Sequence, residues 1–147
     1  MKTFHDVVAA RAAFLERQNK LLEINLTFFK NLLGQIARKG EIPDDNLICM
    51  ESGKNVGTTV VEDCLELDEK GSCRMKIEIV VTSDRHDILL STQKNGDMFE
   101  LSAMAWFDYM SFKFQDSEME KPEEIDFSKV VDQLFSSIAF HYEVVET

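Results

Sequence analysis

The stretch Phe4–Lys39 constrains the fold of this chain more than any other, because its pattern is that of a single long amphipathic helix. Charged residues occupy one side of the helix, and no proline interrupts it. Thr3 is placed to cap its start and Gly40 to end it. Apolar residues recur at helical spacing in two adjacent columns, Val8, Leu15, Leu22, Phe29 and Ile36 in one and Val7, Phe14, Leu21 and Phe28 in the other.

The length of this helix decides what its apolar stripe can pack against. A helix of 36 residues is about 54 Å long, whereas a compact domain of 147 residues is about 38 Å across. Three outcomes stay open: the helix bends near Asn25–Thr27 or at Gly34, a second copy of the chain covers the protruding stripe, or a different protein covers it. Burying five or six large side chains is worth on the order of 10 kcal/mol before entropy, so a stripe left in water is disfavoured.

The width of the stripe allows two interpretations of the same residues. We expect a homodimer whose interface contains Val8, Leu15, Leu22 and Phe29. A wide stripe is also typical of a helix that packs on a sheet, and it lacks the narrow two-column seam of a coiled coil. Ordinary core packing is therefore the alternative for these side chains.

Composition places the chain among globular proteins. With 147 residues, of which 44% are hydrophobic, it is long enough to form one domain, residues 1–147, with its own core. No run of about eighteen apolar residues is present, and the charged N-terminal residues are unlike a signal peptide. We expect a soluble, cytoplasmic protein with reduced Cys49, Cys64 and Cys73, a Cys64–Cys73 disulfide being the less favoured alternative.

Strand patterns follow the helix. Leu47–Met50 is a candidate short strand, and Thr58–Leu67 and Ser72–Thr82 form a predicted hairpin whose second strand alternates cleanly between apolar and polar residues. Such alternation is typical of an antiparallel sheet with one wet face. Ser83–Asp87 is a predicted turn, Ile88–Gln93 a strand, and Asn95-Gly96 a strong hairpin signal.

The stretch Met98–Phe114 holds the densest group of apolar residues. Its alternation starts on odd-numbered residues and then moves to Phe112 and Phe114, which predicts a bulge or break near Asp108–Ser111. We expect one long bent strand at the centre of the sheet, with the first helix on one face and the C-terminal helix or a partner on the other. Ordinary core is the alternative to a partner-binding or ligand-binding role for its candidate residues, Trp106, Phe107, Tyr109, Met110 and Phe112.

The end of the chain completes the predicted fold. Gln115–Asp126 is rich in acids and contains Pro122, which is typical of a solvated loop. Asp126 is placed to cap a last helix from Phe127 to about Tyr142. The sequence thus predicts an α+β domain with a long N-terminal helix, an antiparallel meander sheet of four to five strands and a C-terminal helix.

Charge is distributed unevenly along the chain. The net charge is −11, but residues 1–40 carry +4 and residues 115–147 carry −7. Direct binding of nucleic acid by the whole surface is disfavoured, because phosphate contacts need clustered Lys and Arg. Either the acidic surface serves solubility, or it attracts a basic partner through Asp116, Glu118, Glu120, Glu123 and Glu124.

Residue patterns that carry catalysis are absent from the sequence. His5, His86 and His141 have no neighbours at metal-ligand spacing, and the glycine-containing loop 52–57 lacks the ending of a phosphate-binding loop. Carboxylates flank only His86, within Asp84–Asp87, where a turn explains the acids equally well. G-x-S-x-G, H-E-x-x-H and G-x-G-x-x-G motifs do not occur. We therefore expect no enzymatic activity, no cofactor and no metal.

The predicted architecture, a small acidic α+β domain that dimerises, is similar to that of type III secretion chaperones. Ligand-binding folds in which a helix lies on a curved sheet are also compatible with it. The secretion chaperones place a helix in the middle of the sheet, however, and this sequence predicts none there. Likeness of architecture alone is a weak guide to function.

Three functions stay open on this basis. The first is a non-catalytic protein-binding or regulatory module, dimeric through the first helix, that engages a partner with its acidic loop or its bent strand. The second is a carrier of a small apolar ligand in a pocket between the first helix and the sheet, lined by Trp106 and its neighbours. The third is an acidic inhibitor of a nucleic-acid enzyme, whose binding would collapse as salt rises.

Overall fold

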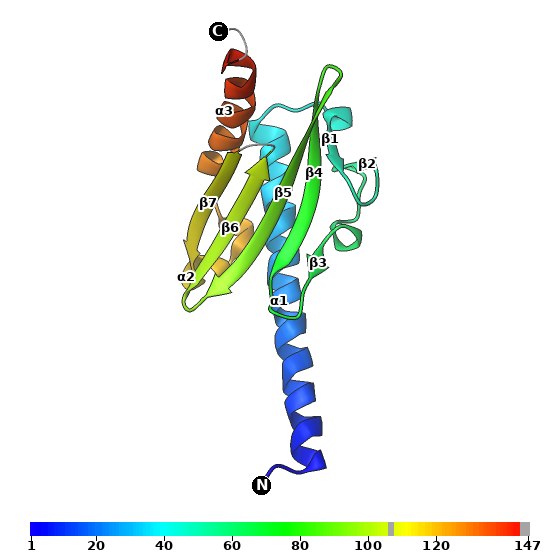
Figure 1. Cartoon of the computed structure of the whole chain (residues 1–147), viewed down its shortest axis with the longest axis vertical. Coiled ribbons are helices and arrows are strands. Elements are labelled where there is room, and N and C mark those ends of the chain that lie inside the picture. The colour runs from blue at the N-terminus through cyan, green and yellow to red at the C-terminus, as the bar shows by residue number, and fades with distance from the viewer. Residues whose placement is uncertain (106–107, 145–147) are drawn as a thin grey trace.

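Two long helices and a seven-stranded antiparallel sheet make up most of the fold in the computed structural model, which describes residues 1–105 and 108–144. α1 (Phe4–Lys39) and α3 (Ser128–Val144) enclose the core with one face of the sheet (Figure 1). The predicted α+β class is confirmed, with seven strands in place of four to five. They are β1 (Leu47–Cys49), β2 (Lys54–Asn55), β3 (Glu66–Leu67), β4 (Cys73–Val81), β5 (Asp84–Asn95), β6 (Met98–Ala105) and β7 (Asp108–Gln115).

The four long strands form the predicted meander. The order across the sheet is β2-β1-β4-β5-β6-β7, and β3 also pairs with β4. Tight turns join β4 to β5 and β5 to β6, since Val81 pairs with Asp84 and Asn95 with Met98. Gly96 in the second turn has a φ of 65°, the left-handed conformation that glycine adopts without strain.

Residues 58–67 do not form the predicted strand. They contain a short 3-10 helix, η2 (Val61–Asp63), and only the two residues of β3. The Asn55 side chain accepts a hydrogen bond from the backbone N–H of Thr58 at 3.0 Å. Local bonds of this kind hold the backbone in a turn and compete with strand pairing.

β5 begins earlier than the sequence predicts. The turn before it consists of Thr82 and Ser83 alone, so His86 lies within the strand and pairs with Ile79. Glu78 on β4 is buried and receives the Arg85 guanidinium at 2.8 Å. Cross-strand pairing of this charged segment explains why its acids and bases do not mark a loop.

Met98–Phe114 is a hairpin at the sheet edge and not one bent central strand. β6 ends at Ala105, which pairs with Asp108 at the start of β7. Each odd-numbered residue of β6 pairs with an even-numbered residue of β7. Paired residues in an antiparallel sheet point to the same face, so odd residues of β6 and even residues of β7 share one face. Phe99 and Phe114 are such a buried pair. The apolar phase shift therefore marks a chain reversal.

The acidic segment after β7 is folded onto α1. It forms α2 (Asp116–Met119) and the short helix η3 (Pro122–Glu124). Met119, Pro122 and Ile125 are buried, whereas Glu118, Glu120, Glu123 and Glu124 are exposed. The prediction of a solvated loop is thus wrong in two respects: the backbone forms short helices, and every third side chain from Met119 to Ile125 is buried.

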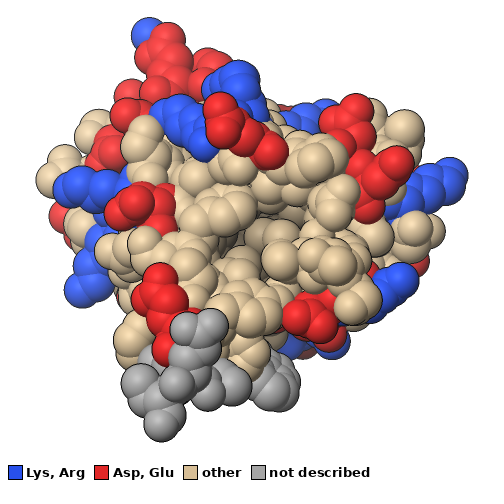
Figure 2. Space-filling view, turned by 90° about the horizontal axis from the view of Figure 1, so that it is seen from above, with Lys and Arg blue, Asp and Glu red and all other residues tan. Residues whose placement is uncertain are grey.

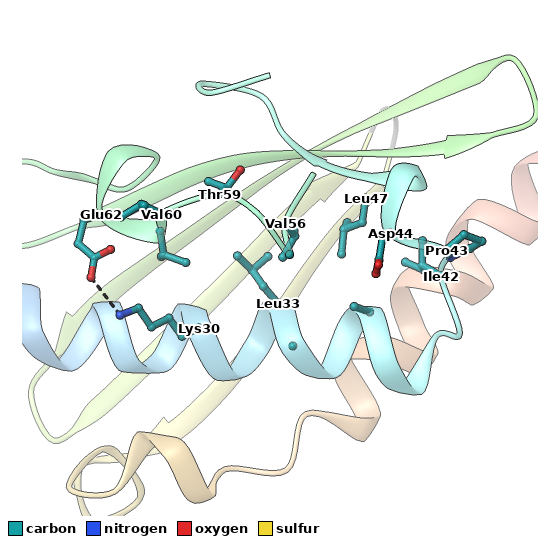
Figure 3. A pocket seen from close by; sticks show the side chains of 14 residues that line it. Lys30, Leu33, Ile42, Pro43, Asp44, Leu47, Val56, Thr59, Val60 and Glu62 are labelled. Atoms are coloured by element: carbon teal, nitrogen blue, oxygen red, sulfur yellow. Dashed lines mark hydrogen bonds and ion pairs between the residues drawn. The ribbon is translucent and has the colours of Figure 1, made fainter. Parts of the chain in front are cut away.

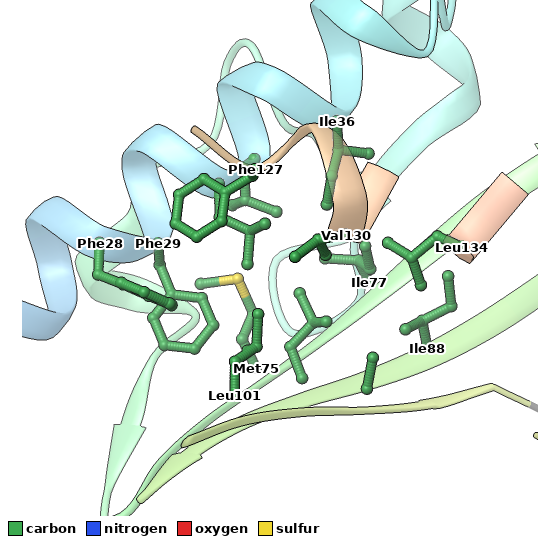
Figure 4. Close-up of a cluster of buried hydrophobic side chains, with 14 of the residues drawn as sticks. Phe28, Phe29, Ile36, Met75, Ile77, Ile88, Leu101, Phe127, Val130 and Leu134 are labelled. Carbon is green, nitrogen blue, oxygen red and sulfur yellow. The ribbon is translucent and has the colours of Figure 1, made fainter. Parts of the chain in front are cut away.

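The core lies between the sheet and the helices, and α1 reaches it only with its C-terminal half (Figure 4). The first buried residue of α1 is Asn25, whose Oδ1 accepts the Thr92 hydroxyl of β5 at 2.6 Å. Phe28 lies at the centre, with ring centroids 5.0–5.7 Å from those of Phe29, Phe99, Phe114 and Phe127. α3 contributes Val130 and Leu134 on the same side of the sheet, not on its other face.

Polar side chains of α1 hold the segment that leads into α3. Gln35 Oε1 accepts the Phe127 N–H at 2.7 Å, and Gln35 Nε2 donates to the Ile125 carbonyl at 2.7 Å. Asn31 donates to the carbonyls of Pro122 and Ile125. These bonds satisfy backbone groups that burial would otherwise leave unpaired.

Candidate functional site

The N-terminal half of α1 projects beyond the rest of the molecule as a free rod (Figure 1). Thr3 and Asp6 form a reciprocal capping box at its start, and the helix runs without a break to Lys39. The alternative of a break near Asn25–Thr27 or at Gly34 is not seen, since one α-helix spans both places. Large apolar side chains are exposed along the rod: Phe4 (78%), Val7 (61%), Val8 (51%), Phe14 (39%) and Leu15 (41%).

The four residues predicted for a dimer interface are divided between the rod and the core. Val8 and Leu15 are exposed, Leu22 is half-buried, and Phe29 is fully buried in the chain's own core. One column of the helix therefore packs on the sheet at one end and stands in solvent at the other. The exposed part of this surface, Phe4–Leu15, is called the projecting stripe below.

A notch lies where the projecting stripe meets the sheet. It has a volume of about 610 Å³ and is bounded by α1, the β3–β4 turn and the β5–β6 turn. Phe14, Leu21 and Ile24 supply its apolar lining from α1. Its charged residues are mostly basic: Arg17, Lys20, Lys70 and Lys94, with Glu69 as the acid.

A second hollow, the groove, lies farther along α1, between this helix and residues 42–62 (Figure 3). Its volume is about 510 Å³, and Leu33, Leu47, Val56 and Val60 line it. Lys30 on α1 bridges to Glu62 of η2 at 3.0 Å across one end. The groove is thus an apolar trough between the first helix and the short strands.

The predicted aromatic site is only partly assembled. Tyr109 is 58% exposed, and its hydroxyl lies 2.9 Å from the Ser102 hydroxyl. With Met110 it borders an open hollow of about 540 Å³ beside Gln133 and Phe140 of α3. Met110 is buried and Phe112 half-buried on the core side. Trp106 and Phe107 lie outside the described residues. Neither the groove nor the notch is lined by Tyr109, Met110 or Phe112.

The predicted acidic surface lies on α2 and η3. Asp116 is half-buried and pairs with Lys94 at 3.7 Å, whereas the four glutamates are exposed. Figure 2 views the molecule from above, at the end away from α2, and there acidic and basic side chains surround an uncharged, hollowed centre.

His86 belongs to a hydrogen-bond chain that anchors the end of α3. Tyr142 donates to Asp84 Oδ2 at 2.8 Å, and His86 Nε2 lies 2.6 Å from the Tyr142 hydroxyl. Loss of hydration together with the Asp84 carboxylate raises the pKa of Tyr142. The adjoining cavity is only about 20 Å³. This arrangement joins β5 to α3 and leaves little room for a substrate.

The three cysteines are buried free thiols. Burial raises the pKa of both the Cys49 and the Cys73 thiol to about 12, so both stay protonated. Cys73 pairs with Leu67 across β3 and β4, so Cys64 does not lie opposite it. Within residues 1–105 and 108–144, no group of three His, Cys, Asp or Glu side chains is arranged to hold a metal ion. Nor does a helix in these ranges have the length and apolar character to cross a membrane.

Comparison with known proteins finds no matching family, no matching curated protein and no matching solved structure. Sequence reasoning identified the projecting stripe, but it missed both hollows. The notch depends on two turns meeting one helix, and the groove depends on a segment predicted as a strand. Local periodicity carries no signal for either.

Proposed function

We propose that this chain is a non-catalytic protein-binding module that forms a homodimer through the projecting stripe. One observation carries the proposal: α1 continues past its own domain with large apolar side chains exposed along one surface. Isolated helical segments of this length are marginal in water unless an apolar face is packed. A partner that covers the stripe supplies that packing.

The exposed area is at the lower limit for a stable interface. Five large side chains, each about half exposed, offer about 500 Å² per copy. A pair of copies then buries about 1,000 Å², which is the smallest area expected of a specific complex. The proposed dimer therefore dissociates on dilution. The surfaces that bind another protein are then the ones that the two paired helices do not cover.

Light scattering on a sizing column across a dilution series tests the dimer. We expect a mass near twice 16.9 kDa at high concentration that falls on dilution. Leu15→Glu places a charge on the stripe without touching the core and is expected to yield the monomer. Glu16→Gln, on the opposite side of the helix, is the matched control. A wild-type protein that is monomeric at every concentration would contradict the proposal.

A small apolar ligand in the groove is the second candidate, favoured by the apolar lining between α1 and residues 42–62. It keeps the predicted place between the first helix and the sheet but not the predicted aromatic lining. Gly34 borders the groove, and a Cβ atom added there meets nothing within 4 Å. Bulk at this position is expected to fill the groove without disturbing the fold.

Binding of a fluorescent fatty acid distinguishes this second candidate. Wild type and Gly34→Ala are expected to bind the probe equally, and Gly34→Phe to bind it at least tenfold more weakly. Equal binding by Gly34→Phe would place the probe elsewhere and remove the support for the groove.

A further inference from the structure

The notch contains a buried hydrogen-bond acceptor without a partner. Gln18 donates from Nε2 to the Glu69 carbonyl at 3.3 Å, but its Oε1 is buried and makes no hydrogen bond with the described residues. Gln18 lines the notch beside Phe14 and Leu21. Because an unmet buried acceptor is costly, an occupant of the notch that carries donors as well as apolar side chains is favoured if the Gln18 amide turns to meet it.

The projecting stripe leads directly into this notch. Phe4, Val7 and Phe14 lie along the face of α1 that Phe28 and Phe29 continue into the core. The sheet therefore occupies, farther along the helix, the same side on which a second helix would pack. A second helix laid on the stripe must end against the β3–β4 and β5–β6 turns.

This geometry restricts how two copies can pair. In a parallel pair, both sheets would lie at the same level and between the two helices, where they would occupy the same space. In an antiparallel pair the two sheets lie at opposite ends. Each helix then runs along the stripe of the other toward the other copy's turns.

We infer that the homodimer is antiparallel, with the first helical turn of each α1 seated in the notch of the other copy. The inference rests on the dimer proposed above and names the occupant of the notch. Phe4 and Val7 supply apolar side chains to Phe14, Leu21 and Ile24, and the nearby Lys2 ammonium is a donor for Gln18 Oε1.

The need for more buried area than the stripe alone provides supports the binding of each helix end in the other copy's notch. The stripe alone gives about 1,000 Å², at the threshold for specific association. Phe4 has the most exposed side chain of the stripe, at 78%, and lies at its far end. If α1 contacted only the stripe of the other copy, Phe4 would stay partly exposed. Contact with the other copy's notch buries it fully. The two-fold arrangement uses two notches and two helix ends, which leaves neither unpaired.

Cysteine cross-linking on the full-length chain tests the orientation. Separately made His5→Cys and Lys70→Cys proteins are mixed, allowed to exchange, and treated with a short, flexible bis-maleimide. Within one chain, residues 5 and 70 are separated by about 20 Å of helix, since Gln18 bonds to Glu69 beside residue 70. The three native cysteines are buried, so the wild type is the control for their labelling.

An antiparallel dimer is expected to give the mixed His5→Cys and Lys70→Cys product and little product from His5→Cys alone. A parallel dimer would give the reverse and would overturn the inference while leaving the dimer intact. Light scattering on the same samples reports the dimer itself, so a monomeric mass identifies failure of the underlying proposal. Addition of Phe4→Ala to the His5→Cys chain is expected to lower the mixed product at least fivefold.

Discussion

Individual residues show how the same amino acid serves opposite purposes in this chain. Gly34 lies within a helix on an exposed surface, where glycine costs backbone entropy and provides no contact. Gly71 has a φ of 84°, and a side chain there would lie 2.7 Å from Leu21. The first glycine is replaceable, whereas the second is required by its backbone and by its neighbour.

Gly34→Ala is expected to stabilise the fold by about 1 kcal/mol, because alanine restricts the unfolded chain and its methyl group meets nothing within 4 Å. Urea unfolding followed by circular dichroism measures the change. Gly71→Ala is the contrasting variant, and a loss of at least about 1 kcal/mol is expected from its strained backbone. Equal effects of the two substitutions would contradict this assignment.

Asp126 links stability to pH at the start of α3. Hydrogen bonds from the Lys39 ammonium, at 2.6 Å, and from Ser128 hold the pKa of this carboxyl well below its usual range. A lowered pKa in the folded state means that the contribution is present above the ordinary aspartate pKa of about 3.9. It is lost as the pH falls toward the pKa of the folded state.

Asp126→Asn is therefore expected to lower the melting temperature at pH 7 and to have progressively less effect below about pH 4. Thermal melts at half-unit pH steps measure this difference. Glu123→Gln is the control, since Glu123 is exposed and makes no hydrogen bond or ion pair with the described residues. A constant difference between wild type and Asp126→Asn down to pH 2 would contradict the role of the carboxylate.

At the scale of elements, polar contacts join α1 to the segment before α3. Gln35→Leu keeps the side-chain volume but removes the acceptor for the Phe127 N–H. A cost of about 2–3 kcal/mol is expected, because a buried donor is left unpaired. The urea midpoint measures it, with exposed Gln133→Leu as a control expected to remain within about 0.5 kcal/mol. Similar losses in both variants would mean that apolar exposure, not the lost bond, sets the effect.

Helices and strands could be predicted from the sequence where a local residue pattern is compatible with only one structure. Thr3 and Gly40 marked the ends of α1, and the alternation of β4 placed its residues on the correct faces. Met98–Phe114 was misread because a bulge within one strand and a reversal between two paired strands shift the apolar alternation in the same way. Met119, Pro122 and Ile125 were hidden among acids, although their three-residue spacing was a signal of a packed segment.

The whole molecule shows why the candidate interface could be predicted only in part. Val8 and Phe29 stand in the same helical column and are chemically alike, yet one is exposed and the other is core. Periodicity identifies the face of a helix but not the point along it where the sheet ends. That point is set by turns distant in sequence, at Lys70 and Gly96. The same turns create the notch, so it too was beyond local reasoning.

The difference between the two ends of α1 leads to a prediction about concentration. Phe29→Ala removes a ring from the core and is expected to cost about 3–5 kcal/mol at every protein concentration. Leu15→Ala leaves the core intact and favours the helix. This variant is expected to be a monomer, so its melting temperature should equal that of the diluted wild type at every concentration. Only a dimer makes the melting temperature depend on concentration. Calorimetric scans over a hundredfold concentration range separate the two effects. If Leu15→Ala lowered the melting temperature equally at all concentrations, Leu15 would stabilise the monomer, and the rod would not be the surface on which two copies meet.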